Sequence, residues 1–168
     1  MTYLTKLKGA PAPVPPRPPL RELGFIAGGA LLASLLIGYL AHTTGQPLIM
    51  GSFGTSIFVL FVVPESPFAQ PRNVIVAHCL TTFIGLGFYH WISPDWWSMA
   101  IALTVAITLI QFFRVPHPPA GSNPVIVFLS APGWEFLLMP ALIGAVILVA
   151  VAAVYNNLSS HRSYPKYW

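Results

Sequence analysis

The feature that most constrains this chain is a polar, proline-rich stretch at residues 114–124, which lies between two apolar segments. It reads RVPHPPAGSNP and holds four prolines, one histidine and one arginine. Because proline fixes φ and has no backbone donor, residues 115–119 are expected to run extended. From Ala120 onward, small polar residues, a proline and then apolar residues are typical of a helix start. The free N–H groups and the dipole at such a start favour a bound anion.

The composition indicates an integral membrane protein. Of the 168 residues, 55% are hydrophobic and 7% are charged, whereas soluble domains carry about 25% charged residues. The net charge is +4, but the basic residues cluster near the ends of the chain, as the positive-inside rule predicts, and form no nucleic-acid surface. A lone Cys79 excludes an internal disulfide.

Three parts are expected along the chain. Residues 1–20 contain Lys6, Lys8 and Arg17, with six prolines between Pro11 and Pro19. This composition predicts an extended, solvated, cytoplasmic tail. Residues 21–158 are expected to form one transmembrane domain, and residues 159–168 a cytoplasmic C-terminal tail.

Six apolar segments make up the expected membrane domain, at residues 24–41, 47–63, 73–92, 96–113, 122–131 and 136–155. The first, third, fourth and sixth have 18 to 20 residues, close to the roughly 20 that a spanning helix needs. The second is interrupted by the sequence GSFGTS, and the fifth is too short to span. Each of these two is predicted to join an extended piece (46–50 or 115–119) to a half-helix (51–63 or 120–131).

The sequence therefore predicts an all-α integral membrane fold of two three-segment halves, each with a broken half-helix segment, related as an inverted repeat. With six crossings, all eight Lys and Arg residues and both termini are cytoplasmic. The alternative is four transmembrane helices plus two re-entrant loops, which would put Arg72 and Arg114 outside. Charge favours six crossings, but both arrangements stay open. In the inverted repeat the two half-helix N-termini face each other near mid-membrane, where an anion would relieve the repulsion between their dipoles.

The two half-helix starts supply the expected anion-binding residues. These are Gly51, Ser52, Gly54, Thr55, Ser56, His117, Pro118, Pro119, Ala120, Gly121, Ser122 and Asn123. The small residues have a packing alternative, because such residues let membrane helices approach closely. His117 could carry a proton or donate to an anion, but it could equally bridge backbone groups freed by the flanking prolines.

Three further residues are candidates for a proton or anion pathway. His78 lies inside the third segment, where an ionisable residue is a functional hypothesis, although a histidine hydrogen-bonded across a helix pair is the alternative. Arg114 and Arg72 could attract anions or simply anchor the domain at the membrane surface. No metal site is expected because no two histidines show ligand spacing, and no cofactor is expected. The protein is not expected to be an enzyme, because no nucleophile has a base partner at a recognisable spacing.

Three motifs carry a family resemblance. HPPAGSNP at residues 117–124, GSFGTS at 51–56 and QPRN at 70–73 resemble the HPP family of small integral membrane proteins, over about residues 21–155. Members from plastids and cyanobacteria are implicated in nitrite transport, so the resemblance implies a transporter or channel for a small inorganic anion such as nitrite. The alternative is a non-transporting membrane scaffold. The expected partners are the anion and the lipid bilayer, with no nucleic acid, and a homo-oligomer is left open. The sequence shows no Ser-rich, Arg-rich transit peptide, which favours a bacterial inner membrane.

Overall fold

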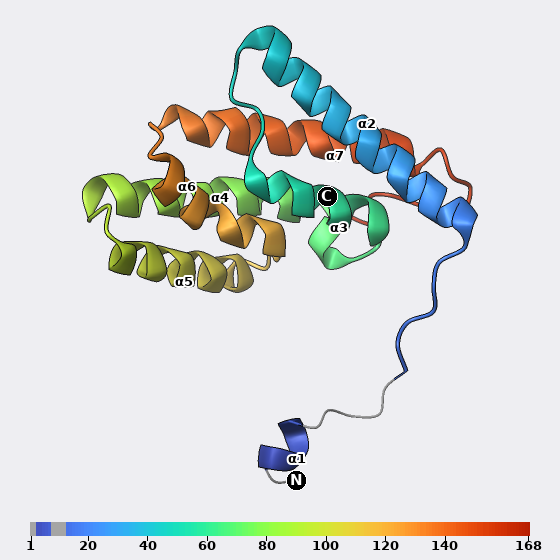
Figure 1. Cartoon of the computed structure of the whole chain (residues 1–168), viewed down its shortest axis with the longest axis horizontal. Helices are drawn as coiled ribbons and strands as arrows, with labels where there is room; N and C mark the ends of the chain where they lie inside the picture. Colours follow the sequence, from blue (N-terminus) through green and yellow to red (C-terminus); the bar gives the residue numbers. More distant parts are fainter. Residues whose placement is uncertain (1–2, 8–12) are drawn as a thin grey trace.

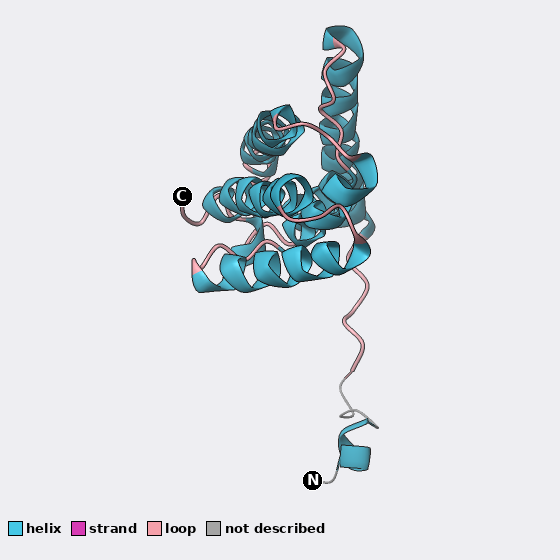
Figure 2. Ribbon diagram, turned by 90° about the vertical axis from the view of Figure 1, so that its left-hand side faces the viewer, coloured by secondary structure: helices cyan, strands magenta, loops and turns pink. Residues whose placement is uncertain are grey.

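The computed structural model of the chain describes residues 3–7 and 13–168. These parts contain helices and no β-strand, so the predicted all-α class is confirmed (Figures 1 and 2). The α-helices are α1 (Tyr3–Leu7), α2 (Leu20–Thr44), α3 (Gly51–Val62), α4 (Pro71–Trp91), α5 (Trp96–Phe112), α6 (Asn123–Ser130) and α7 (Ile143–Asn156). Short 3-10 turns η1 (Pro67–Ala69) and η2 (Pro118–Ser122) precede α4 and α6, and a π-helical turn η3 (Leu137–Leu142) leads into α7.

The N-terminal segment differs in part from the expected extended tail. Residues 13–19 have no regular secondary structure and are exposed, as predicted. The prediction is wrong at Tyr3–Leu7, which forms the short helix α1; these five residues contain no proline, so nothing in the backbone opposes a helical turn. Lys8 and Pro11 lie outside the described residues.

Within the described residues, three stretches are long and apolar enough to cross a membrane: α2, α4 and the segment Leu137–Asn156, which is kinked at Met139. The protein is therefore an integral membrane protein with three candidate spans. Helix α5 is also apolar but has 17 residues, one fewer than predicted, because Phe113 leaves the helix as its C-cap. Helix α2 ends where Gly45 takes a left-handed conformation with φ 67°, which glycine adopts without steric cost.

The two interrupted segments have the predicted form in part. An extended piece precedes each short helix, but the prediction is wrong at Pro118 and Pro119, which belong to the 3-10 turn η2. Met50 is extended, with φ −129° and ψ 140°, and α3 begins at the next residue. The second half-helix starts later than expected, since Ala120 belongs to the 3-10 turn η2 and α6 begins at Asn123. The tandem prolines at the start of η2 remove two backbone donors, whereas Pro124 fits the first turn of a helix, where no donor is needed.

Helix α4 is the centre of the bundle and packs against α5, α6, α7 and both short turns η2 and η3 (Figure 1). Glycine allows the closest of these approaches. A Cβ at Gly85 would lie 2.9 Å from the Cα of Pro124, closer than real Cβ atoms come. Small residues of α5 allow a close approach on another side of α4, where Ala102 and Ala106 are fully buried against Ile84.

The C-terminal residues pack onto one end of the bundle instead of forming a free tail. Tyr164 is buried, and its hydroxyl donates to the carbonyl oxygen of Ala69 at 2.8 Å. Arg162 forms an ion pair with Glu22 at the start of α2. The start of α2, the turn before α4 and the C-terminus therefore lie at the same end.

Candidate functional site

Two fully buried histidines face each other in the middle of this apolar bundle. His78 comes from the second turn of α4 and His117 caps the start of η2, and both are 0% exposed. Their ring centroids are 5.1 Å apart. The hydroxyl of Ser56, on α3, lies between them with its Oγ 2.9 Å from each Nε2 atom. Three separate segments thus bring polar side chains to one point.

The hydrogen on His117 can be placed from its partners. Its Nδ1 lies 2.6 Å from the carbonyl oxygen of Phe68 in η1. A carbonyl oxygen only accepts, so Nδ1 carries the hydrogen and donates it. In the neutral imidazole Nε2 is then bare, and it accepts a hydrogen bond from the hydroxyl of Ser56.

The position of the hydrogen on His78 follows from the same matching of donors to acceptors. Ser56 has one hydrogen, and its Oγ also lies 3.2 Å from the Ser52 carbonyl oxygen. That carbonyl accepts a backbone N–H of its own helix, whereas the bare Nε2 of His117, at 2.9 Å, needs the hydroxyl hydrogen. The Nε2 of His78 must then donate to the Ser56 oxygen. The Nδ1 of neutral His78 is then an acceptor, and the amide nitrogen of Asn123 lies 3.1 Å from it. Every donor in the series Asn123, His78, Ser56, His117 and Phe68 therefore meets an acceptor. The two imidazoles hold opposite tautomers.

Asn123 anchors the far end of this series. It is the first residue of α6 and is fully buried. Its amide nitrogen also approaches the Thr82 hydroxyl at 3.0 Å and the His78 carbonyl oxygen at 3.2 Å. Among the described residues its Oδ1 has no hydrogen-bond partner, and neither has the buried Oγ of Ser52 in the first turn of α3. An unpaired buried polar atom is costly, and each of these two atoms lacks a hydrogen bond that a buried polar atom normally makes.

The comparisons with known proteins agree with the sequence motifs. The profile of the HPP transmembrane region matches residues 15–165. The chain belongs to the HPP family. A transmembrane protein of Dictyostelium discoideum is 34% identical over 166 residues, which cover 92% of this chain and 58% of the relative. A second one is 27% identical over 178 residues, which cover 99% of this chain and 57% of the relative. The chain thus spans less than two thirds of the curated relatives it matches, and no solved structure matches it.

In this HPP protein the predicted anion-binding residues divide into two groups. One group is buried and includes the cluster residues Ser56, His117 and Asn123; its members are Ser52, Ser56, His117, Pro119, Ala120, Gly121 and Asn123. Those on outer faces are exposed: Gly51, Gly54, Thr55, Pro118 and Ser122. A Cβ added to Gly54 would meet no atom within 4 Å, so this glycine does not lie against the cluster.

The two half-helices meet differently from the expected end-to-end arrangement. A Cβ at Gly51, the first residue of α3, would lie 3.7 Å from Ile126 in α6. Five residues further along α3, Ser56 contacts His117. The N-terminal turns therefore overlap side by side with opposite direction. Side chains of the cluster fill the space between them.

The three residues predicted to form a proton or anion pathway lie in two different parts of the structure. His78 belongs to the cluster. Arg72 is exposed at the end of the bundle, where its guanidinium donates to the carbonyl oxygen of Arg114 at 2.8 Å. Arg114 is exposed beside it. Neither is among the contacts of the two histidines, and this favours the anchoring interpretation of the arginines.

Sequence reasoning missed three parts of the site. Thr82 and Gly85 lie four and seven residues after His78, hence on the same face of α4, and this spacing could have identified them. Thr82 contacts the Asn123 amide, and Gly85 lets α6 approach closely enough for that contact. The Phe68 carbonyl oxygen is a main-chain atom, for which the sequence gives no signal.

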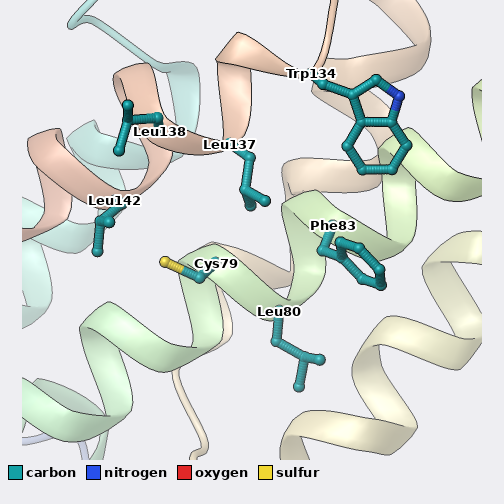
Figure 3. A pocket seen from close by; sticks show the side chains of 7 residues that line it. All are labelled: Cys79, Leu80, Phe83, Trp134, Leu137, Leu138 and Leu142. Carbon is teal, nitrogen blue, oxygen red and sulfur yellow. The ribbon is translucent and has the colours of Figure 1, made fainter.

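A separate apolar pocket lies on another side of α4, toward the segment that leads into α7 (Figure 3). Its volume is about 500 Å³. Its lining residues are Cys79, Leu80, Phe83, Trp134, Leu137, Leu138 and Leu142. Apart from the Cys79 thiol and the Trp134 indole the lining is apolar, so the pocket does not suit an ion. Among the described residues no cluster of three or more His, Cys, Asp or Glu could hold a metal ion.

Proposed function

We propose that this HPP protein transports a small inorganic anion, such as nitrite, across a membrane. The observation that carries the proposal is the buried cluster of Ser56, His78, His117 and Asn123, where the short helices α3 and α6 and the turn η2 meet α4. Polar and ionisable groups are costly inside a membrane domain and mark substrate or proton paths. Interrupted segments that carry half-helices at matching places in two halves of a membrane protein are a recurrent way to build an ion or substrate site.

The anion-binding groups are at the first turn of α3. The N–H groups of Gly51 and Ser52 there carry partial positive charge, and the unpartnered hydroxyl of Ser52 can donate to an anion. His117 is held from its other side by Phe68, so it orients Ser56 and can share in proton movement. Anion binding thus uses atoms that the protein itself leaves free.

The six-crossing inverted repeat is the topology that we propose for this function. The contact between Arg72 and the Arg114 carbonyl oxygen, together with the C-terminal contacts at the same end, supports it. With the positive-inside rule, both termini face the cytoplasm.

Energetics favour coupling of the anion to a proton. At an inside-negative potential of about 150 mV, bringing in one negative charge costs roughly 3.5 kcal/mol. This disfavours accumulation several-hundred-fold, since about 1.4 kcal/mol is a factor of ten. A proton that travels with the anion makes the cycle electroneutral, and the paired imidazoles are the groups able to carry it.

Nitrite uptake into liposomes that contain only this protein tests the function. Ser52 and Ser98 form a matched pair of test and control, because both are buried and their hydroxyls lack a hydrogen-bond partner. Replacing either serine with alanine therefore removes no hydrogen bond within the protein. Ser98 lies in the first turn of α5, away from the cluster. We expect Ser52→Ala to reduce uptake about tenfold and Ser98→Ala to leave it unchanged. Wild-type uptake equal to that of empty liposomes would reject transport and favour a scaffold role.

A further inference from the structure

The amide of Asn123 has two hydrogen-bonding faces, and the structure uses only one. Its nitrogen meets three acceptors: His78 Nδ1, His78 O and Thr82 Oγ1. Its oxygen is buried and meets no partner among the described residues. In this orientation the free face of the amide is an acceptor, which suits a hydrogen-bond donor and repels an anion.

Protonation of His78 would reverse this preference. The Nε2 of His78 already donates to Ser56, so an additional proton can enter only at Nδ1. That atom would then be a donor facing the amide nitrogen of Asn123, 3.1 Å away, and two donors cannot bond to each other. Rotation of the amide by half a turn removes the conflict.

The rotated amide is satisfied on its inner face. Its oxygen would accept from the Nδ1–H of His78 and from the hydroxyl of Thr82, which is free to turn its hydrogen. The His78 carbonyl oxygen would lose the amide hydrogen but keeps its helical main-chain partner, because His78 lies inside α4. The NH₂ group would then point to the side on which the oxygen now has no partner.

We propose that Asn123 is a proton-linked switch that creates an anion-binding donor group. Uptake of one proton at Nδ1 of His78 turns the amide, so that its NH₂ replaces its oxygen on the free face and binds one monovalent anion. The proton brings one positive charge and the anion one negative charge, so the loaded site is neutral. Release of the proton restores the acceptor face and expels the anion. This inference rests on the proposed transport function and assigns its coupling step.

His78 and His117 are the groups at this site that can take up the proton. His117 is the titratable group that faces it, and α3 and α6 present the uncharged residues Phe53, Ser56 and Asn123. From α5, apolar residues of the Ala102 and Ala106 face pack onto α4. Cys79, the next residue on α4, lines the apolar pocket.

Nitrogen-15 NMR of the imidazoles tests the switch in protein that is reconstituted in lipid and keeps both buried histidines. Replacing His42, His90 and His161 with glutamine leaves only the two buried histidines. Contact of one Nδ1 with carbonyl carbons of labelled phenylalanine identifies His117, because that atom bonds to Phe68. We expect opposite tautomers without nitrite, and a second hydrogen on His78 when nitrite is added at constant pH. A neutral His78 at saturating nitrite would overturn the switch.

Transport by Asn123→Asp provides the second arm. A carboxylate accepts from a protonated His78 but has no hydrogen to give to an anion, so we expect His78 to stay doubly protonated and nitrite uptake to fall at least tenfold. Uptake by Asn123→Asp at the wild-type rate would contradict the switch and leave anion transport intact. Absence of uptake by the wild-type protein would instead reject the proposed function, and the switch with it.

Discussion

The guanidinium of Arg72 donates a hydrogen bond to the carbonyl oxygen of Arg114 at 2.8 Å, although 42 residues separate them. This contact joins the start of α4 to the end of α5. The C-terminal segment adds contacts at the same place, since the Asn73 amide donates to the Tyr167 hydroxyl at 3.0 Å. One end of the bundle therefore gathers both arginines and the C-terminus. A topology that separates them by a membrane would break these contacts.

We predict that this end faces the cytoplasm. In a Cys79→Ala background, Glu65→Cys should resist a membrane-impermeant thiol reagent in intact cells, because Glu65 pairs with Lys166 at this end. Asp95→Cys, in the turn between α4 and α5, should react from outside. Strong outside labelling at position 65 would remove the six-crossing arrangement and its inverted repeat.

We predict opposite stability effects for two glycine-to-alanine changes. Gly85→Ala places a Cβ 2.9 Å from the Cα of Pro124, so α6 must move away from α4, and overpacking of this kind costs about 1–3 kcal/mol. In Gly38→Ala on α2 the added Cβ meets no atom within 4 Å. This change should stabilise the folded protein by about 0.5–1 kcal/mol, because alanine favours a helix more than glycine does. Thermal unfolding in detergent measures both changes. Equal effects would mean that the contact at Gly85 does not limit packing.

The sequence predicted the broken segments well because their causes are local. Prolines and glycines set the backbone near His117 and Met50, and these effects do not depend on the rest of the fold. The same holds for the apolar runs that became α2, α4 and α7. The later start of α6 at Asn123 shows the usual limit, since helix boundaries depend on where each backbone donor finds a partner.

The composition of the cluster could be predicted only in part. His78, His117, Ser56 and Asn123 were each identified from their residue type and segment, yet nothing in the spacing joined them, because 61 residues separate Ser56 from His117. Gly54 and Thr55 were predicted to present donors to the anion at the half-helix start, yet both are exposed. Helical rotation turns them to another face. Tertiary packing decided which half of each motif is buried.

We predict that Tyr164 makes stability fall at alkaline pH. Burial raises the pKa of its hydroxyl above the ordinary value of about 10, so the folded state holds the proton more tightly than the unfolded state. The associated stability is present below pH 10 and declines as pH rises above it. Tyr164→Phe removes the bond to Ala69, which contributes about 1 kcal/mol. The variant should unfold earlier than wild type at pH 7 and show a weaker decline above pH 10.

The last prediction concerns the hydroxyl that connects the two histidines. Ser56→Ala leaves the bare Nε2 of His117 without a donor and the Nε2–H of His78 without an acceptor, and both rings are fully buried. Each unsatisfied buried group costs about 1–3 kcal/mol, so thermal unfolding in detergent should show a loss of at least that size.

Ser130→Ala is the control for this change, because the Ser130 hydroxyl is exposed and bonds only to the Ile126 carbonyl oxygen of its own helix at 2.7 Å. It should change stability by less than about 0.5 kcal/mol. Nitrogen-15 spectra add a readout that general loosening would not produce. Without Ser56, nothing fixes the tautomer of His78 from its Nε2 side, while Phe68 still holds His117. We therefore expect mixed tautomers for His78 and a single one for His117. A single unchanged tautomer at both rings, with stability equal to that of Ser130→Ala, would show that Ser56 does not couple them.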